Sequence, residues 1–263
     1  MFFECLFLIC ILSCVVVSLV DSLQANQDSM FIAGLRERRL FDLAETYCND
    51  QLANQQLTER ELVDLSVELI RVHTEHALNS RGDDRAALWD RCKDVAADYN
   101  NPKLPRTILV RVQAALAVLA RGELDRLESE VSSVPEEALV SAREILRVAS
   151  TDLRTIDREL EDTIPIRRRN PLRPNELSAK ELTSLQNHVR YQLARCYKNQ
   201  ALCYPPKSND RTASLTAAID QKRGASRWYP LFSPCNPAEP GPAGSCRSGG
   251  RKSTQAENQN PPP

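Results

Sequence analysis

The chain has 263 residues, of which 42% are hydrophobic, only 5% are aromatic and 26% are charged. This balance is typical of proteins in which helices rich in Ala, Leu, Glu and Arg pack on one another, and it argues against a β-sandwich. The 34 basic and 35 acidic side chains give a formal net charge of -1. No global electric field would therefore concentrate nucleic acid or an anionic membrane at the surface, and we expect no nucleic-acid partner.

Residues 1–22 are predicted to be a signal peptide. Leu6 to Val20 is an apolar run in which only Ser and Cys are weakly polar, and it is shorter than a typical membrane-spanning helix of about 20 residues. The small residues near Ser22 suit a cleavage site after Ser22, so we expect export to a periplasm or secretion. Glu4 departs from the usual basic start of a signal peptide. An uncleaved membrane anchor and a mis-assigned start are the alternatives.

Nine cysteines occur in the chain, and three of them would leave with the signal peptide. The others include no C-x-x-C pair, so neither a zinc site nor thioredoxin-like chemistry is predicted. An oxidising compartment would permit disulfides. Cys196 and Cys203, however, lie on one predicted helix about 10 Å apart, which is beyond disulfide reach. We interpret the remaining cysteines as small apolar residues on helix faces. They are Cys48, Cys92, Cys196, Cys203, Cys235 and Cys246.

Between residues 27 and 221 the apolar residues recur at the three- and four-residue steps of a helix, which predicts about seven helices. The strongest pattern covers residues 134–162. Short connections make consecutive helices antiparallel neighbours. The apolar stripes comprise Leu62, Leu65, Leu69 and Val72; Leu109, Val112, Leu116 and Leu119; and Leu139, Ala142, Leu146, Ala149, Leu153, Ile156 and Leu160.

Two helix starts carry a capping box, in which a hydroxyl and a carboxylate three residues apart each satisfy a free backbone N–H. They are Thr58-x-x-Glu61 and Ser178-x-x-Glu181, and leucines at the flanking staple positions strengthen both. Weaker signals and predicted breaks lie elsewhere. Ser133-x-x-Glu136 is a weaker box, Pro105 suits a first turn, and breaks are expected at Ser80 to Asp83, Asn101-Pro102, Gly122 and Pro165 to Pro174.

Residues 222–263 contain half of the 16 prolines and five of the eight glycines, with no apolar periodicity, and are predicted to be disordered. The change comes inside a helical pattern, because Arg211 to Gln221 begins an amphipathic helix with no partner after it. A repeat array normally closes with a polar cap. We therefore expect that the array is truncated, through a frameshift for example. The residues from Trp228 onward would then not belong to the native repeat sequence.

Several segments resemble the hairpin of tetratricopeptide-repeat (TPR) proteins, in which a large residue, a turn, an aromatic and a small residue follow at fixed offsets. The resemblance is to the N-terminal portion of long exported bacterial TPR-like proteins. It implies a short solenoid of antiparallel helical hairpins over residues 27–221, and it implies a binding scaffold for a protein or peptide partner rather than an enzyme. The residues that carry it are Phe31, Leu35, Phe41, Ala44 and Cys48; Ala114, Ala115, Val118, Gly122, Leu124 and Leu127; and Tyr191, Ala194 and Ala201.

Two polar motifs could form sites. His73 and His76 have a spacing that can ligate a metal, but zinc hydrolases use H-E-x-x-H with a third ligand, and the only other histidine is His188. We interpret them as solvated or edge-of-core histidines. The run Arg167 to Arg169 lies between prolines and is interpreted as a solvated linker, with a carboxylate clamp or a proteolytic site as the alternatives.

No enzyme motif is present: there is no G-x-S-x-G elbow, no Gly-rich phosphate loop and no reactive-cysteine motif. Paired carboxylates such as Glu136-Glu137 and Glu159 to Asp162 are interpreted as solvated helix faces. We therefore predict an exported non-catalytic interaction scaffold with no catalytic residue, no cofactor and no metal. The alternatives are an envelope coiled-coil protein that associates through the helix at residues 134–162, and a membrane-anchored assembly factor.

Overall fold

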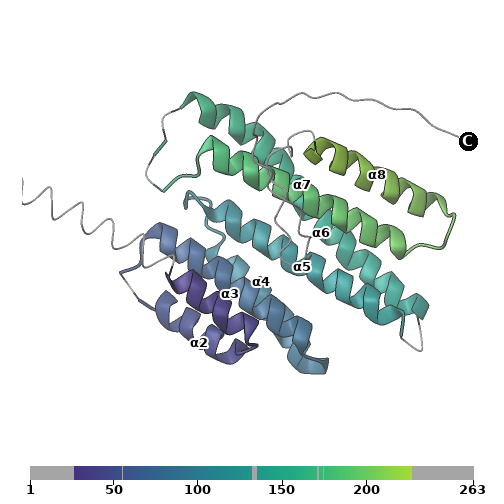
Figure 1. Cartoon of the computed structure of the whole chain (residues 1–263), viewed down its shortest axis with the longest axis horizontal. Helices are drawn as coiled ribbons and strands as arrows, with labels where there is room; N and C mark the ends of the chain where they lie inside the picture. The colour runs from purple at the N-terminus through teal and green to yellow at the C-terminus, as the bar shows by residue number, and fades with distance from the viewer. Residues whose placement is uncertain (1–26, 55, 132–134, 171, 174, 227–263) are drawn as a thin grey trace, which may run out of the picture. The chain divides into compact units, whose positions relative to one another are not determined.

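A computed structural model describes residues 27–54, 56–131, 135–170, 172–173 and 175–226, and this part of the chain is all-α, as predicted. It contains eight helices rather than about seven. Figure 1 labels all of them except the first. They are a helix over residues 27–37, α2 (Phe41–Leu52), α3 (Glu59–Asn79), α4 (Gly82–Tyr99), α5 (Thr107–Ser129), α6 (Pro135–Arg169), α7 (Ala179–Leu202) and α8 (Asn209–Ser226).

Both capping boxes are confirmed. At the start of α3, the backbone N–H of Glu61 donates to Thr58 Oγ1 at 3.2 Å, and the N–H of Thr58 donates to Glu61 Oε2 at 2.8 Å. Ser178 and Glu181 repeat this exchange at the start of α7, with the same distances. Each box satisfies two N–H groups that the helix itself leaves unpaired, so these helix starts are set by local sequence.

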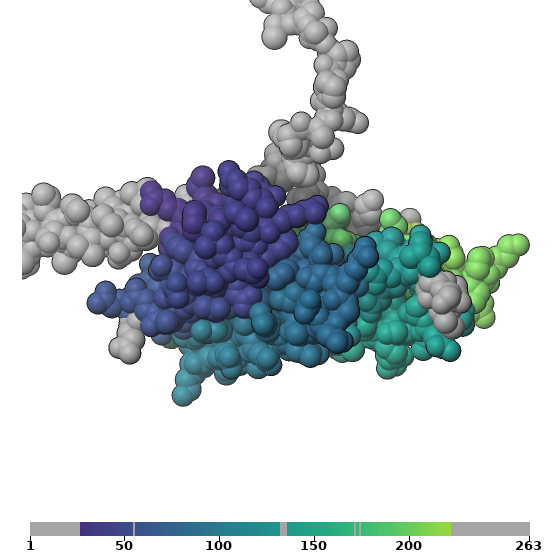
Figure 2. All heavy atoms as spheres, turned by 90° about the horizontal axis from the view of Figure 1, so that it is seen from below, coloured from purple at the N-terminus to yellow at the C-terminus, as the bar shows by residue number. Residues whose placement is uncertain are grey.

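Each helix from α2 onward packs on the next one in the chain, and α5 also packs on both α3 and α7. Figure 1 shows α5, α6 and α7 lying side by side. Figure 2 shows one face on which the side chains of the N-terminal helices, purple to blue, adjoin the teal surface of the later helices. Neighbouring hairpins are therefore joined through α3, α5 and α7.

The core is continuous because α3 and α5 each bury two faces. Leu65, Leu69 and Val72 of α3 pack on the helix at residues 27–37 and on α2, whereas Val63 and Ile70 pack on α4 and α5. In the same way, α5 contributes to the cluster with α3 and α4 and to a larger one with α6 and α7. A helix that buries two faces connects the hairpins on either side of it.

The predicted break at Gly122 is wrong, because α5 continues through it to Ser129. Gly122 is buried against α6, and a Cβ at this position would lie 2.8 Å from Leu146 Cγ. The glycine does not turn the chain; it lets α5 and α6 approach each other closely. The TPR-like hairpin expected around Ala114 to Leu127 is therefore a stretch of one helix.

The predicted break over Pro165 to Pro174 begins later than expected, because α6 runs for 35 residues, continues through Pro165 and ends at Arg169. The proline lacks the N–H that would bond the carbonyl of Glu161. Both residues lie on the exposed side of the helix, where water can satisfy that carbonyl, while Ile164 on the other side stays in the core. The expected core stripe of this helix is confirmed, with Leu146, Leu153 and Leu160 fully buried.

The break at Ser80 to Asp83 is confirmed, and Gly82 begins α4 at φ 58, a backbone conformation that glycine adopts most readily. Pro105 lies two residues before α5 rather than in its first turn. The signal peptide with Ser22, the box residue Ser133, and residues 227–263 of the predicted tail lie outside the described residues.

Candidate functional site

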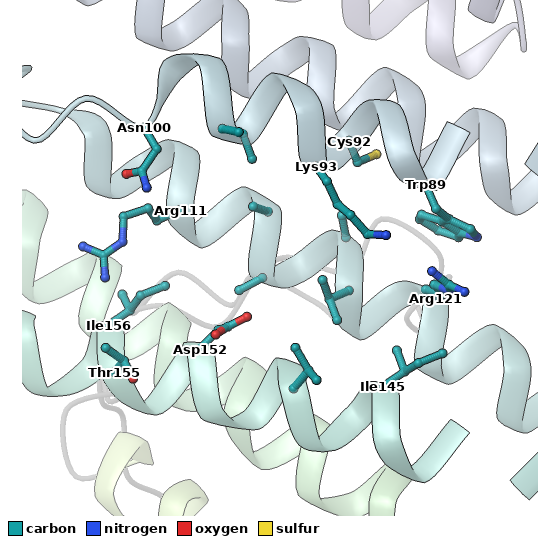
Figure 3. Close-up of a pocket in the computed structure, with 17 residues that line it drawn as sticks. Trp89, Cys92, Lys93, Asn100, Arg111, Arg121, Ile145, Asp152, Thr155 and Ile156 are labelled. Carbon is teal, nitrogen blue, oxygen red and sulfur yellow. The ribbon is translucent and has the colours of Figure 1, made fainter. Parts of the chain in front are cut away.

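A groove of about 520 Å³ lies between α4 and α6, and α5 forms its floor (Figure 3). Each of the three helices contributes one stripe at the three- and four-residue steps of a helix face. The stripe on α4, continuing into the residue after it, is Trp89, Cys92, Lys93, Ala96, Ala97 and Asn100; that on α5 is Arg111, Ala114, Ala115, Ala117, Val118 and Arg121; that on α6 is Ile145, Val148, Asp152, Thr155 and Ile156.

The groove exists because α4 and α6 both pack on α5 but, within the described residues, not on each other. The floor between them carries small side chains, notably Ala114, Ala117 and Val118. On α6, Val148 is 51% exposed in the wall of the groove, whereas Leu146 and Ala149 of the core stripe are fully buried. An exposed apolar wall above a floor of small residues leaves room for a further apolar element.

Charged side chains lie mainly at the two ends of the groove. Figure 3 shows Trp89 and Arg121 at one end, Asn100 and Arg111 at the other, and Asp152 between them on α6. Partial burial raises the pKa of Asp152, and the nearby Arg111 guanidinium opposes this rise. The groove therefore has an apolar middle, cationic ends and one carboxylate.

The thiol of Cys92, at the Trp89 end, is not a nucleophile poised for chemistry. Cys92 is only 3% exposed, and burial raises its pKa to about 11. Its Sγ lies 3.7 Å from Thr74 Oγ1 and 3.8 Å from the carbonyl oxygen of Ile70. A thiol with a raised pKa is protonated at neutral pH and unreactive.

The three histidines do not come together, because His188 is on α7, which does not pack on α3 in the part of the chain described. The interpretation of His73 as a solvated or edge-of-core residue is wrong, since it is 3% exposed. Its Nδ1 lies 3.7 Å from Glu45 Oε2, too far for a hydrogen bond. Burial, followed by the charges of Arg91 and His76, lowers the pKa of His73 to about 4.

His73 is therefore a neutral core imidazole at neutral pH. His76, one turn later, stacks on the ring of Phe41 with ring centroids 5.1 Å apart and planes at 18°. Both histidines thus help to pack α2 on α3. Among the described residues, no group of three or more His, Cys, Asp or Glu side chains is placed to hold a metal ion.

The arginine run is part of α6 rather than a linker, which corrects its interpretation. Arg167 is half-buried and forms an ion pair with Glu176, whose carboxylate also accepts a hydrogen bond from the backbone N–H of Arg173 at 3.0 Å. Arg168 and Arg169 are exposed. The clamp that Arg167 makes is thus internal, and it ties the end of α6 to the connection before α7.

The four cysteines in the described part of the chain are all buried and free, which confirms their interpretation as small apolar residues. Burial raises the pKa of Cys48 and of Cys196 to about 12. Cys203 lies just after α7 and donates from Sγ to the carbonyl of Asn199 at 3.4 Å. These thiols contribute packing rather than reactivity.

The carboxylates that we singled out on α6 are exposed, and several pair with arginines instead of facing one another. Glu159 forms an ion pair with Arg111 at 2.5 Å, and Glu161 lies 3.9 Å from a guanidinium nitrogen of Arg190. Glu136 lies 3.7 Å from Arg143. General acid and base catalysis needs two groups directed at one substrate position, and these three side chains are spread along the helix.

Sequence reasoning missed the groove. A signal for it was present on α6, because Ile145 and Val148 are apolar residues outside the core stripe of that helix. A second apolar face indicates a second contact. No described helix is long and apolar enough to cross a membrane. Comparison of the chain with protein-family models, curated proteins and solved structures finds no match.

Proposed function

We propose that this chain is a non-catalytic interaction scaffold of TPR-like helical hairpins, which stack as a short solenoid and hold a helical segment of another protein in the α4–α6 groove. The groove is the single observation that carries the proposal. Its stripes on α4, α5 and α6 each span about eleven residues, or about 16 Å along a helix axis. That length matches about three turns of a bound helix, which is a common mode of peptide recognition.

The way the hairpins are joined supports a scaffold. Contacts of α5 with both α3 and α7 continue from one hairpin to the next, as in stacked repeats. The units are unequal, because α6 alone has 35 residues, about the length of a complete 34-residue TPR unit. The proposed scaffold is accordingly an irregular stack of hairpins that resembles TPR proteins.

The packing of α6 favours a scaffold over the coiled-coil alternative. Leu146, Leu153 and Leu160, which would form the seam of a coiled coil, are fully buried in the cluster that α6 forms with α5 and α7. Self-association through this stripe would require α6 to separate from α5 and α7 of the same chain. The groove residues Val148 and Ile145 lie on a different face and remain accessible to a partner.

Export is part of the proposal and rests on the apolar run Leu6 to Val20. Sequencing of the mature N-terminus after expression with secretion machinery tests it. A start near Leu23 supports cleavage after Ser22 and release. Retention of Met1 in a membrane fraction would instead support the anchored assembly factor.

Selection of helical peptides of about four turns against the full chain tests the groove, with Ala114→Trp as the matched variant. The indole fills the floor, so peptides selected on the unmodified chain should lose at least about tenfold in affinity. If the variant is misfolded by circular dichroism, Val148→Asp replaces it, because this side chain is half exposed. Binders that are equally tight to the chain and to a folded variant would contradict the proposal.

A further inference from the structure

The charges around the groove describe what kind of helix would fit it. Of the side chains that line it, Lys93, Arg111 and Arg121 are cationic and only Asp152 is anionic. Figure 3 shows Arg111 and Arg121 at opposite ends, and Lys93 with its amine toward the Trp89 and Arg121 end. Cations therefore flank an apolar middle at both ends.

These cations are available to a partner to different degrees. Within the described residues, Arg121 forms no ion pair and no side-chain hydrogen bond, although Asp90 and Asp125 are near enough to feel its charge. Arg111 pairs with Glu159, and Lys93 pairs with Asp90 at 2.7 Å. Both ion pairs are substantially exposed, so each contributes little to the stability of the fold. The cation of each pair can therefore also interact with a carboxylate of a partner.

The spacing of the two arginines matches a helical repeat. Arg111 and Arg121 are ten residues apart on α5, about 15 Å along its axis. On a partner helix, positions i and i+11 are separated by about three turns and lie on the same face. Between them, positions i+4 and i+7 project on that face and would meet Ala114, Val118 and Val148.

We propose that the occupant is an amphipathic helix of another protein, with apolar residues at i+4 and i+7 between acidic residues at i and i+11. This inference rests on the proposed function of the groove and adds the chemistry of the partner. The two carboxylates meet Arg111 at one end and Arg121 with Lys93 at the other, while the apolar residues cover the alanine floor. Asp152 repels acidic residues placed at the middle of the helix, which helps to fix the register.

Two synthetic helices on an alanine background test the inference. Both carry Leu at i+4 and i+7, and they differ only in having Glu or Lys at i and i+11. Fluorescence anisotropy with the full chain should show the Glu peptide binding about tenfold more tightly than the Lys peptide. This preference should shrink as salt is added, because the contacts are partly exposed.

Charge reversal at the groove tests the same point from the protein side. Arg121→Glu should lower the affinity of the Glu peptide by about tenfold and raise that of the Lys peptide. Asp152→Asn should raise the affinity of the Glu peptide severalfold. Arg158→Glu is the matched control, because Arg158 is exposed on α6 and does not line the groove. It should change neither affinity beyond the small effect of net charge. If Arg121→Glu fails to fold, Arg121→Gln replaces it and should weaken the Glu peptide severalfold.

The outcomes separate this inference from the proposed function. If both peptides bind equally and Ala114→Trp removes both, helices dock in the groove without charge selection, and only this inference fails. If the Glu peptide binds more tightly than the Lys peptide but Ala114→Trp does not change its affinity, its carboxylates bind elsewhere, and the inference also fails. If neither peptide binds, the inference fails, and the library selection decides the proposed function separately.

Discussion

Gly122→Ala should destabilise the chain, although alanine is the better helix former. The new Cβ would lie 2.8 Å from Leu146 Cγ, 2.9 Å from Leu146 Cδ2 and 3.2 Å from Ile145 Cγ2, well inside the usual carbon–carbon separation of about 3.5–4.0 Å. Leu146 is fully buried and cannot swing into solvent. Overpacking costs about 1–3 kcal/mol and the gain in helix propensity is about 1 kcal/mol, so we expect a net loss of about 1 kcal/mol.

Gly34→Ala is the matched control, because Gly34 also lies inside a helix but its new Cβ would meet only the end of the flexible Arg38 side chain, at 3.1 Å. That side chain can move, so the propensity gain should dominate and stabilise the chain by up to about 1 kcal/mol. Urea unfolding followed by circular dichroism measures both variants. The two free energies of unfolding should differ by about 2 kcal/mol. Equal stabilisation by both substitutions would refute the close approach of α5 and α6.

Three further predictions concern other parts of the fold. In the folded chain the pKa of His73 is about 4, so the side chain stays neutral above that pH. In the unfolded chain its pKa is about 6.5. The free energy of unfolding should therefore fall by roughly 3 kcal/mol as the pH drops from 6.5 to 4, relative to His73→Gln; a pH-independent difference would contradict this. Ser178→Ala should cost about 1 kcal/mol, and an unchanged denaturation midpoint would show that the cap contributes nothing. Leu153→Ala should cost about 2–5 kcal/mol, whereas Val148→Ala, on the half-exposed groove wall of the same helix, should cost well under 1 kcal/mol; equal losses would contradict the assignment of faces.

Features governed by neighbouring residues were predictable from sequence. The capping boxes at Thr58 and Ser178 depend on residues three positions apart, so the pattern contains all the partners that form them. The core stripe of α6 was predictable for a similar reason, since periodic apolar residues bury one face of a helix whatever lies opposite.

Features decided by tertiary packing were not predictable from local rules. Gly122 was expected to turn the chain, but its partner is Leu146, a residue on another helix that sequence spacing does not identify. His73 was expected near solvent because histidine is polar, but α3 is covered by helices on two faces. The groove has the same origin, because it depends on α4 and α6 packing on α5 without meeting each other. The local sequence pattern indicates which secondary structure and which degree of burial a residue prefers. Tertiary packing determines which residues it contacts.

Methyl NMR of the chain with a bound helical peptide tests the groove as a docking site most directly. We expect intermolecular contacts between the apolar residues of the peptide and the methyl groups of Ala114, Val118 and Val148. The exposed Leu215 and Ile219 of α8 serve as an internal reference and should show none. Contacts at α8 with unperturbed methyl groups in the groove would contradict the account.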